Sequence, residues 1–233
     1  MNALTSLAAA SFAFVGSHFL LSHPLRRPLV ARVGEGPFLG LYSLVALATF
    51  GWLIWAALRS PGEPLWWVAP PWLWDVAAIV MLLASILLVG SLIGNPAAPD
   101  PTGKPHIPDQ ARGVLAITRH PMMWSFILWA AVHAILWGSA ANLIIVAAIA
   151  ILSFFGALAQ DAKKERLLGA DWKTWERRTA FWPFAAQISG RAGWGATLPR
   201  PGVWIGGLLL WLAATWAHGW LGAPAVGLWR WVA

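Results

Sequence analysis

The sequence predicts an all-α fold, a polytopic membrane helical bundle of about six transmembrane helices with both termini outside (periplasmic). Three observations predict it. Of the 233 residues, 59% are hydrophobic and only 11% are charged, whereas soluble domains carry about 25% charged residues. The apolar residues form long continuous runs, and the basic residues gather in alternate connections between those runs.

Six apolar segments are long enough to cross a bilayer, whose hydrocarbon core needs about 20 residues of helix. The runs are continuous and rich in Ala and Leu, which favours helices over the alternating pattern of membrane strands. We interpret residues 1–233 as a single integral membrane domain. The predicted helices cover residues 3–22, 38–58, 73–94, 122–138, 141–160 and 202–222.

The first apolar segment, 3–22, could be mistaken for a signal peptide. However, no Lys or Arg precedes it and no small-residue cleavage site follows it. It meets the stretch "HPLRRPL", which is typical of the basic flank of a stop-transfer segment. We therefore interpret this segment as the first spanning helix, and the five later runs follow it in alternating directions.

The basic residues predict the orientation of the bundle, because cytoplasmic loops collect Lys and Arg. Of the sixteen basic residues, all but Arg59 and Arg230 fall in connections that six alternating helices place on one side. We expect that side to be the cytoplasm of a bacterium, with the chain as a multi-pass inner membrane protein. The net charge of +7 then reflects topology and anionic headgroups, and no nucleic-acid partner is expected. The basic residues of the inner connections are Arg26, Arg27, Arg32, Lys104, Arg112, Arg119, Lys163, Lys164, Arg166, Lys173, Arg177, Arg178, Arg191 and Arg200.

Two of the predicted cytoplasmic segments, 95–121 and 161–201, are longer than ordinary connections. The first is rich in proline as far as Pro108, and a short interfacial helix is predicted over 110–117. Connections of this length are more often functional than simple tethers. Surface loops with interfacial helices are the alternative interpretation.

The second of these segments is predicted to begin as an amphipathic continuation of the fifth helix. It should break near Gly169 and form a basic helix, with Asp171 as the N-cap and Pro183 as the final stop. Because the chain has no cysteine, thiol nucleophiles and thiolate metal ligands are excluded.

Histidines within apolar segments are the strongest functional signal, because ionisable groups are costly in a membrane. His120 and His133 are thirteen residues apart, which on a helix means ~20 Å of rise and a rotation of about 220°. They cannot bind one metal ion together and must have separate roles. His218, near the outer end of the last helix, is predicted to be an interfacial hydrogen-bonding group.

His133 lies in "WAAVHAILW", with no charged residue close to it on its own helix. A buried neutral imidazole there is either a core histidine bonded to a neighbouring carbonyl or an axial ligand of haem iron. His18 is the predicted second ligand, because Gly16 and Ser17 leave room for a flat ring beside it. The two histidines differ in depth by about 10 Å, a gap that side chains on tilted helices can bridge.

Arg119 and His120 precede Pro121, which suits the first turn of a helix because its missing N–H costs nothing there. The pair is expected at the positive end of that helix, where anions are favoured. Two roles are open: ordering the helix start, or binding an anion such as a haem propionate. Glu165 and Arg166 are expected on the same inner face, where all four residues would form a polar pocket.

Four stretches, "FVGSHFLLSHPLRRPL", "RGVLAITRHPMMW", "WAAVHAILWGSAAN" and "DAKKERLLGADWKTWERRTAFWPF", resemble the NnrU family of bacterial membrane proteins over nearly the whole chain. That family is linked to denitrification and nitric oxide reductase maturation, and it is similar to the zeta-carotene isomerases, membrane enzymes that use haem b. The resemblance implies His18 and His133 as axial ligands. The isomerases carry a further histidine in the second-helix region, and residues 38–58 contain none.

A more distant pattern is similar to isoprenylcysteine carboxyl methyltransferases and phospholipid methyltransferases, which bind S-adenosylmethionine at the cytoplasmic membrane surface. It consists of Arg119-His120-Pro121 followed by an acidic and aromatic stretch that ends at Pro183. The resemblance implies that His120, Glu165 and Arg166 lie near that cofactor.

Three hypotheses follow. The first is a haem b-binding protein that isomerises a lipophilic polyene or acts in nitric oxide physiology with the respiratory nitric oxide reductase system. The second is an S-adenosylmethionine-dependent membrane methyltransferase. The third is a non-catalytic assembly factor whose histidines are structural. All three place the chain in a lipid bilayer.

Overall fold

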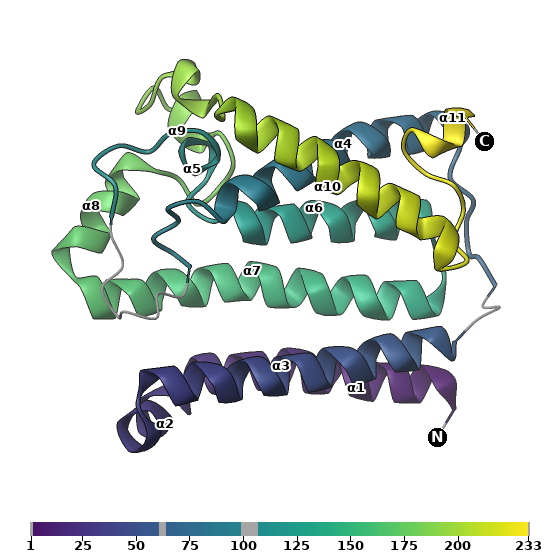
Figure 1. Ribbon diagram of the computed structural model, residues 1–233, viewed down its shortest axis with the longest axis horizontal. Coiled ribbons are helices and arrows are strands. Elements are labelled where there is room, and N and C mark those ends of the chain that lie inside the picture. Colours follow the sequence, from purple (N-terminus) through teal and green to yellow (C-terminus); the bar gives the residue numbers. More distant parts are fainter. Residues whose placement is uncertain (1, 61–63, 99–106, 233) are drawn as a thin grey trace.

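A computed structural model describes residues 2–60, 64–98 and 107–232 of the chain. The regular elements of these residues are helical (Figure 1). Lys104, which was counted among the inner basic residues, lies outside the described residues. In order, the elements are α1 (Ala3–Ser22), α2 (Arg26–Val33), α3 (Glu35–Leu58), α4 (Pro71–Ser91), α5 (Val114–Ile117), α6 (Pro121–Leu136), α7 (Ala140–Leu168), α8 (Ala170–Arg178), α9 (Ala185–Ile188), the 3₁₀ turn η1 (Trp194–Thr197), α10 (Pro201–Trp220) and α11 (Trp229–Val232).

Each of the six predicted apolar segments forms a helix, and the all-α class is confirmed. The first helix has the predicted bounds, and most other ends shift by one to three residues. The short helix α2 occupies a stretch for which the sequence predicted only a basic connection. Gly34 separates α2 from α3 with a φ of 84°, a backbone conformation that glycine adopts without strain.

Four helices, α1, α3, α4 and α7, are long and apolar enough to cross a membrane. The apolar helix α6 has 16 residues, which gives about 24 Å of length against a hydrocarbon core of about 30 Å. The predicted sixth segment forms α10, with 20 residues. The chain is therefore of membrane type with four candidate spans, and the count of six stays a prediction.

The long helices run back and forth along one axis (Figure 1). The pair α1 and α3 lies on one side of α7, and α4, α6 and α10 lie on the other (Figure 1). Both termini lie at one end of the bundle, whereas α5, α8 and α9 gather at the other (Figure 1). The side of the membrane that each end faces stays a prediction.

The long segment 161–201, which was predicted to be cytoplasmic, is built largely as predicted. Helix α7 continues through the charged residues after 160 and breaks at Gly169, whose φ is 55°. The N-cap prediction was wrong, because Gly169 caps α8 and Asp171 lies within its first turn. Helix α8 also ends at Arg178, before the predicted stop at Pro183, and the chain then turns back toward the start of α6.

Two buried clusters hold the bundle together. One joins α1, α3 and α7 through small and branched side chains, among them Leu7, Ala10, Ala56 and Ala141. The other lies where α4, α8 and α10 meet, around the fully buried rings of Trp172 and Trp175. Small residues allow membrane helices to approach closely, and the first cluster therefore fixes the α1–α3 pair against α7.

Candidate functional site

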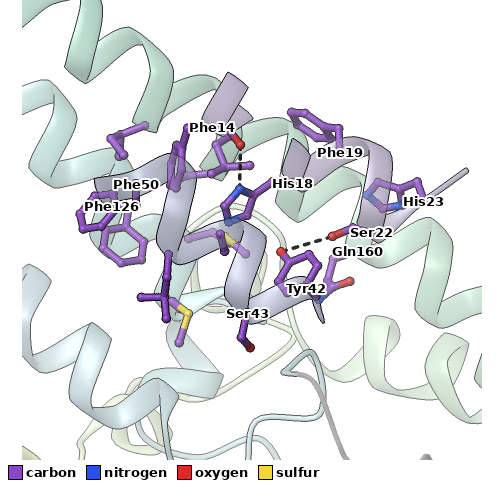
Figure 2. A pocket seen from close by; sticks show the side chains of 18 residues that line it. Phe14, His18, Phe19, Ser22, His23, Tyr42, Ser43, Phe50, Phe126 and Gln160 are labelled. Carbon is purple, nitrogen blue, oxygen red and sulfur yellow. Dashed lines mark hydrogen bonds between the residues drawn. The ribbon is translucent and has the colours of Figure 1, made fainter. Parts of the chain in front are cut away.

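His18 is held in one tautomer by its own helix. Its Nδ1 lies 2.7 Å from the carbonyl oxygen of Phe14, one turn earlier in α1 (Figure 2). Because a carbonyl can only accept, Nδ1 carries the proton and donates it, so that the lone pair of the neutral ring is on Nε2. The ring also contacts Phe14 edge-on, with centroids 4.5 Å apart.

The His18 side chain lines a cavity of about 690 Å³ between α1, α3, α6 and α7. Its walls are mainly aromatic and thioether side chains, with a hydrogen bond of 3.4 Å from Ser22 to Tyr42 at one side (Figure 2). A volume of this size suits a cofactor or another small organic ligand. The apolar walls include Phe14, Phe19, Phe50, Met122, Met123 and Phe126.

The cavity arises from uneven packing of the α1–α3 pair. The buried cluster with α7 engages the start of α1, the end of α3 and the start of α7, at one end of the bundle. Toward the other end, bulky rings replace the small residues of that cluster, and Gly156 of α7 lies at the cavity wall. Leu47 and Phe50 line the cavity yet remain 69% and 42% exposed, so the cavity opens toward the lipid-facing surface.

Two basic side chains, Lys163 and Arg166, lie near one edge of the cavity. His23, which follows α1, lines the cavity and is half-buried. Burial lowers the pKa of His23, and the nearby charges of Lys163 and Arg166 lower it further. The charges of Lys163 and Arg166, which act on this edge, offer a favourable environment for the acidic groups of a ligand that enters the cavity.

His133 lies elsewhere. It lines a second cavity, of about 380 Å³, between α4, α6 and α10, where its ring stacks on Trp129 with centroids 4.1 Å apart. No residue lines both this cavity and the one at His18. The structure therefore does not bring the two predicted ligands together, and one iron between His18 and His133 does not fit this arrangement. Iron binding by either imidazole alone stays a prediction.

Arg119 and His120 form a charged cluster with Asp161 of α7. The His120 ring is 2% exposed, and its Nε2 lies 2.7 Å from Oδ1 of Asp161. The Arg119 guanidinium donates from Nε to both Asp161 oxygens at 2.9 Å and lies 3.6 Å from Glu176. Both side chains thus have their carboxylate partners within the protein, which favours the predicted role of ordering the helix start over that of binding an outside anion.

The predicted polar pocket of Arg119, His120, Glu165 and Arg166 was wrong in Glu165, and Arg166 lies near His23 and Lys163. Glu165 instead pairs with Lys173 at 3.0 Å on the surface, where both side chains are about half exposed. Asp161, which the sequence analysis did not single out, takes the predicted place. One signal was available: Asp161 is the first carboxylate after a long apolar run, one turn of helix before Glu165.

The family follows from a comparison with known proteins. A family model described as NnrU protein matches residues 6–225, nearly the whole chain. The chain belongs to the NnrU family.

A curated relative agrees with this assignment. The protein named 15-cis-zeta-carotene isomerase, chloroplastic, from Zea mays is 31% identical over 90 residues, which is 38% of this chain and 24% of the relative. The match thus spans about a quarter of the isomerase's length. No solved structure matches the chain.

In this member of the NnrU family, the segment after α8 is tied to the start of α6. Thr118 donates to the Phe181 carbonyl at 2.6 Å, and the Trp124 indole donates to the same oxygen at 2.9 Å. The Arg119 backbone N–H donates to Ala180 at 2.9 Å. The Arg119–His120–Asp161 cluster therefore lies at a junction of α6, α7 and the segment after α8, whereas His18 and His133 each line a cavity.

Proposed function

We propose that this NnrU-family protein binds haem b at His18 and acts on a lipophilic polyene that reaches the cavity from the bilayer. The observation that carries the proposal is the free Nε2 of His18 beside an apolar cavity of about 690 Å³. The membrane character of the chain and its relationship to an isomerase named for a carotene support the substrate class. The bacterial inner membrane is the proposed location.

The residues of the cavity suit haem b. Metal-ligating histidines usually donate their other ring N–H to a carbonyl or carboxylate, as His18 does to Phe14. Thioether sulfur is a haem ligand in other proteins, and both Met122 and Met123 line the same cavity. The basic groups of Lys163 and Arg166, near the His23 edge of the cavity, suit the propionates.

The chain's own residues would position and shield the reacting groups. The Phe14 carbonyl fixes the His18 ring, and the phenylalanine walls exclude water and favour a flat conjugated ligand. The lipid-facing opening at Leu47 and Phe50 admits a ligand that is insoluble in water. Bound haem b would supply an iron centre whose oxidation state can change.

The same centre serves the second role predicted for the family, in nitric oxide and denitrification physiology with the nitric oxide reductase system as partner. By contrast, no contact in residues 2–60, 64–98 and 107–232 favours S-adenosylmethionine. Its proposed site depended on Glu165 near His120, and Glu165 pairs with Lys173 instead.

The test is haem titration of the purified protein, followed by oxidised and dithionite-reduced absorption spectra and by incubation of the loaded protein with 15-cis-zeta-carotene. We expect a Soret band that shifts on reduction, and its loss in His18→Ala. The matched control is His23→Ala, which removes the neighbouring imidazole of the same cavity and should keep the band. A wild-type protein that binds no haem, or a His18→Ala variant with an unchanged spectrum, would contradict the proposal.

A further inference from the structure

A second pair of histidines lies in the cavity between α4, α6 and α10. His133 of α6 and His218 of α10 both line it, with ring centroids 6.2 Å apart and ring planes at 27°. From the sequence, His218 was predicted to be an interfacial group and was not paired with His133. The pairing arises because α6 and α10 lie on the same side of α7 (Figure 1).

Both imidazoles present an acceptor nitrogen. Nδ1 of His133 lies 2.8 Å from the Trp129 carbonyl, and Nδ1 of His218 lies 2.7 Å from that of Ala214. Since carbonyls only accept, each Nδ1 donates, and each neutral ring keeps its lone pair on Nε2. Neither Nε2 has a hydrogen-bond partner among the described residues.

The same cavity contains a donor without a partner. Trp211 lines it and is 8% exposed, and its buried indole N–H makes no hydrogen bond within the described residues. A buried donor left unpaired is costly, and natural proteins leave few of them. The amide N–H groups of Asn142 are already used, at 2.9 Å from the His133 carbonyl and 2.6 Å from that of Trp137.

The chemistry of the lining selects a neutral ligand. Among the described residues, those that line this cavity include no Asp, Glu, Lys or Arg, so a charged ligand would find no counter-charge among them. A divalent ion would find two imidazoles and no carboxylate, and no group of three His, Asp or Glu side chains that could hold a metal occurs in the part of the chain that the structure describes. The walls carry the indoles of Trp74, Trp129, Trp137 and Trp211.

We infer that this cavity binds the ring of a membrane-soluble quinol. The quinol hydroxyl groups donate to Nε2 of His133 and Nε2 of His218, and one quinol oxygen accepts the Trp211 N–H. The indole walls stack on the flat ring, and a volume of about 380 Å³ accommodates a substituted six-membered ring. This site shares no lining residue with the His18 cavity, and the inference does not rest on the proposed function.

The experiment is isothermal titration calorimetry of the full chain in detergent under anaerobic conditions, with decylubiquinol and decylubiquinone as the two probes. We expect the quinol to bind at least about tenfold more tightly, because the quinone has no O–H to donate to the two imidazoles. His133→Leu and His218→Leu should each weaken quinol binding about tenfold. Trp211→Phe keeps an aromatic ring but removes the N–H donor, and it should weaken quinol binding about threefold.

The matched control is His18→Leu, which makes the same change in the other cavity and should leave quinol binding unchanged. If a histidine variant fails to fold, as judged by gel filtration, Trp211→Phe and the comparison of quinol with quinone still decide the matter. Equal affinities for quinol and quinone would overturn the inference. So would quinol binding that persists unchanged in the folded histidine variants, or Zn²⁺ binding that depends on both histidines in a protein that binds no quinol.

Discussion

His18 and His120 are both histidines of apolar helix ends, yet the structure gives them opposite surroundings. His18 makes one hydrogen bond, to its own helix, and lines a large apolar cavity. His120 is 2% exposed and lies 2.7 Å from a carboxylate that Arg119 also neutralises. The comparison teaches that an ionisable residue near a membrane is available to a ligand only where its partners leave it free.

The largest effect is expected from a substitution in the closed cluster of Arg119, His120 and Asp161. Asp161→Ala leaves Arg119, 13% exposed, and the buried His120 without their carboxylate. We expect a loss of about 3–5 kcal/mol in the free energy of unfolding, the usual result of removing one member of a buried ion pair. Thermal unfolding in detergent measures it.

The matched control for Asp161→Ala is Glu165→Ala, one turn along the same helix. Glu165 pairs with Lys173 on the surface, where the side chains are 46% and 58% exposed. Such pairs contribute about 0–1 kcal/mol. Equal losses in the two variants would show that the Asp161 cluster is not the structural junction described here.

Alanine variants of His18 and His120 should differ in how much stability they lose. His120→Ala removes a buried partner of Asp161 and should lower the free energy of unfolding by about 2 kcal/mol. His18 borders an existing cavity, and His18→Ala loses a hydrogen bond to its own helix and ring contacts with Phe14 and Tyr42, so we expect a loss of about 1 kcal/mol. Chemical unfolding in mild detergent compares them, and a greater loss in His18→Ala would reverse the account.

Two glycines compare a tightly packed helix contact with the wall of the His18 cavity. A Cβ at Gly207 of α10 would stand 2.8 Å from Cα of Ile86 in α4, whereas one at Gly156 of α7 would meet nothing within 4 Å. Gly207→Ala should therefore destabilise the protein by about 1–3 kcal/mol. Gly156→Ala should stabilise it by about 0.5–1 kcal/mol through helix propensity. Unfolding temperatures that move in the same direction would contradict this.

The smallest effect concerns pH at the edge of the His18 cavity. Because burial and the charges of Lys163 and Arg166 lower the pKa of His23, the unfolded chain takes up a proton there more readily than the folded one. Stability should thus fall slightly as pH drops from the ordinary histidine pKa of about 6.5 toward the lowered value. In His23→Gln, the unfolding temperature should depend less on pH over that range. An unchanged pH dependence would show that other groups cause it.

The sequence predicted the helices well because apolar run length and flanking charge are local properties. The bounds 3–22 of α1 were correct, as was the break at Gly169. The pairing of His120 with Asp161 was missed because it joins residues 41 positions apart, and only the packing of α6 on α7 brings them together.

The iron pair was predicted from the small residues beside His18, from depth along the helices and from the family resemblance. Depth does not say which helices are neighbours, and α7 packs against both α1 and α6, so that His18 and His133 line different cavities. For the same reason the sequence did not connect His133 with His218, which belongs to a helix that begins 80 residues after the start of α6.

The most direct test of the central claim is one haem titration performed side by side on His18→Ala and His120→Ala, followed at the Soret band. We propose the open His18 cavity as the ligand site and the closed His120 cluster as structural, so the band should be lost in the first variant and kept in folded protein of the second. A band that persists in His18→Ala and disappears in folded His120→Ala would contradict the account.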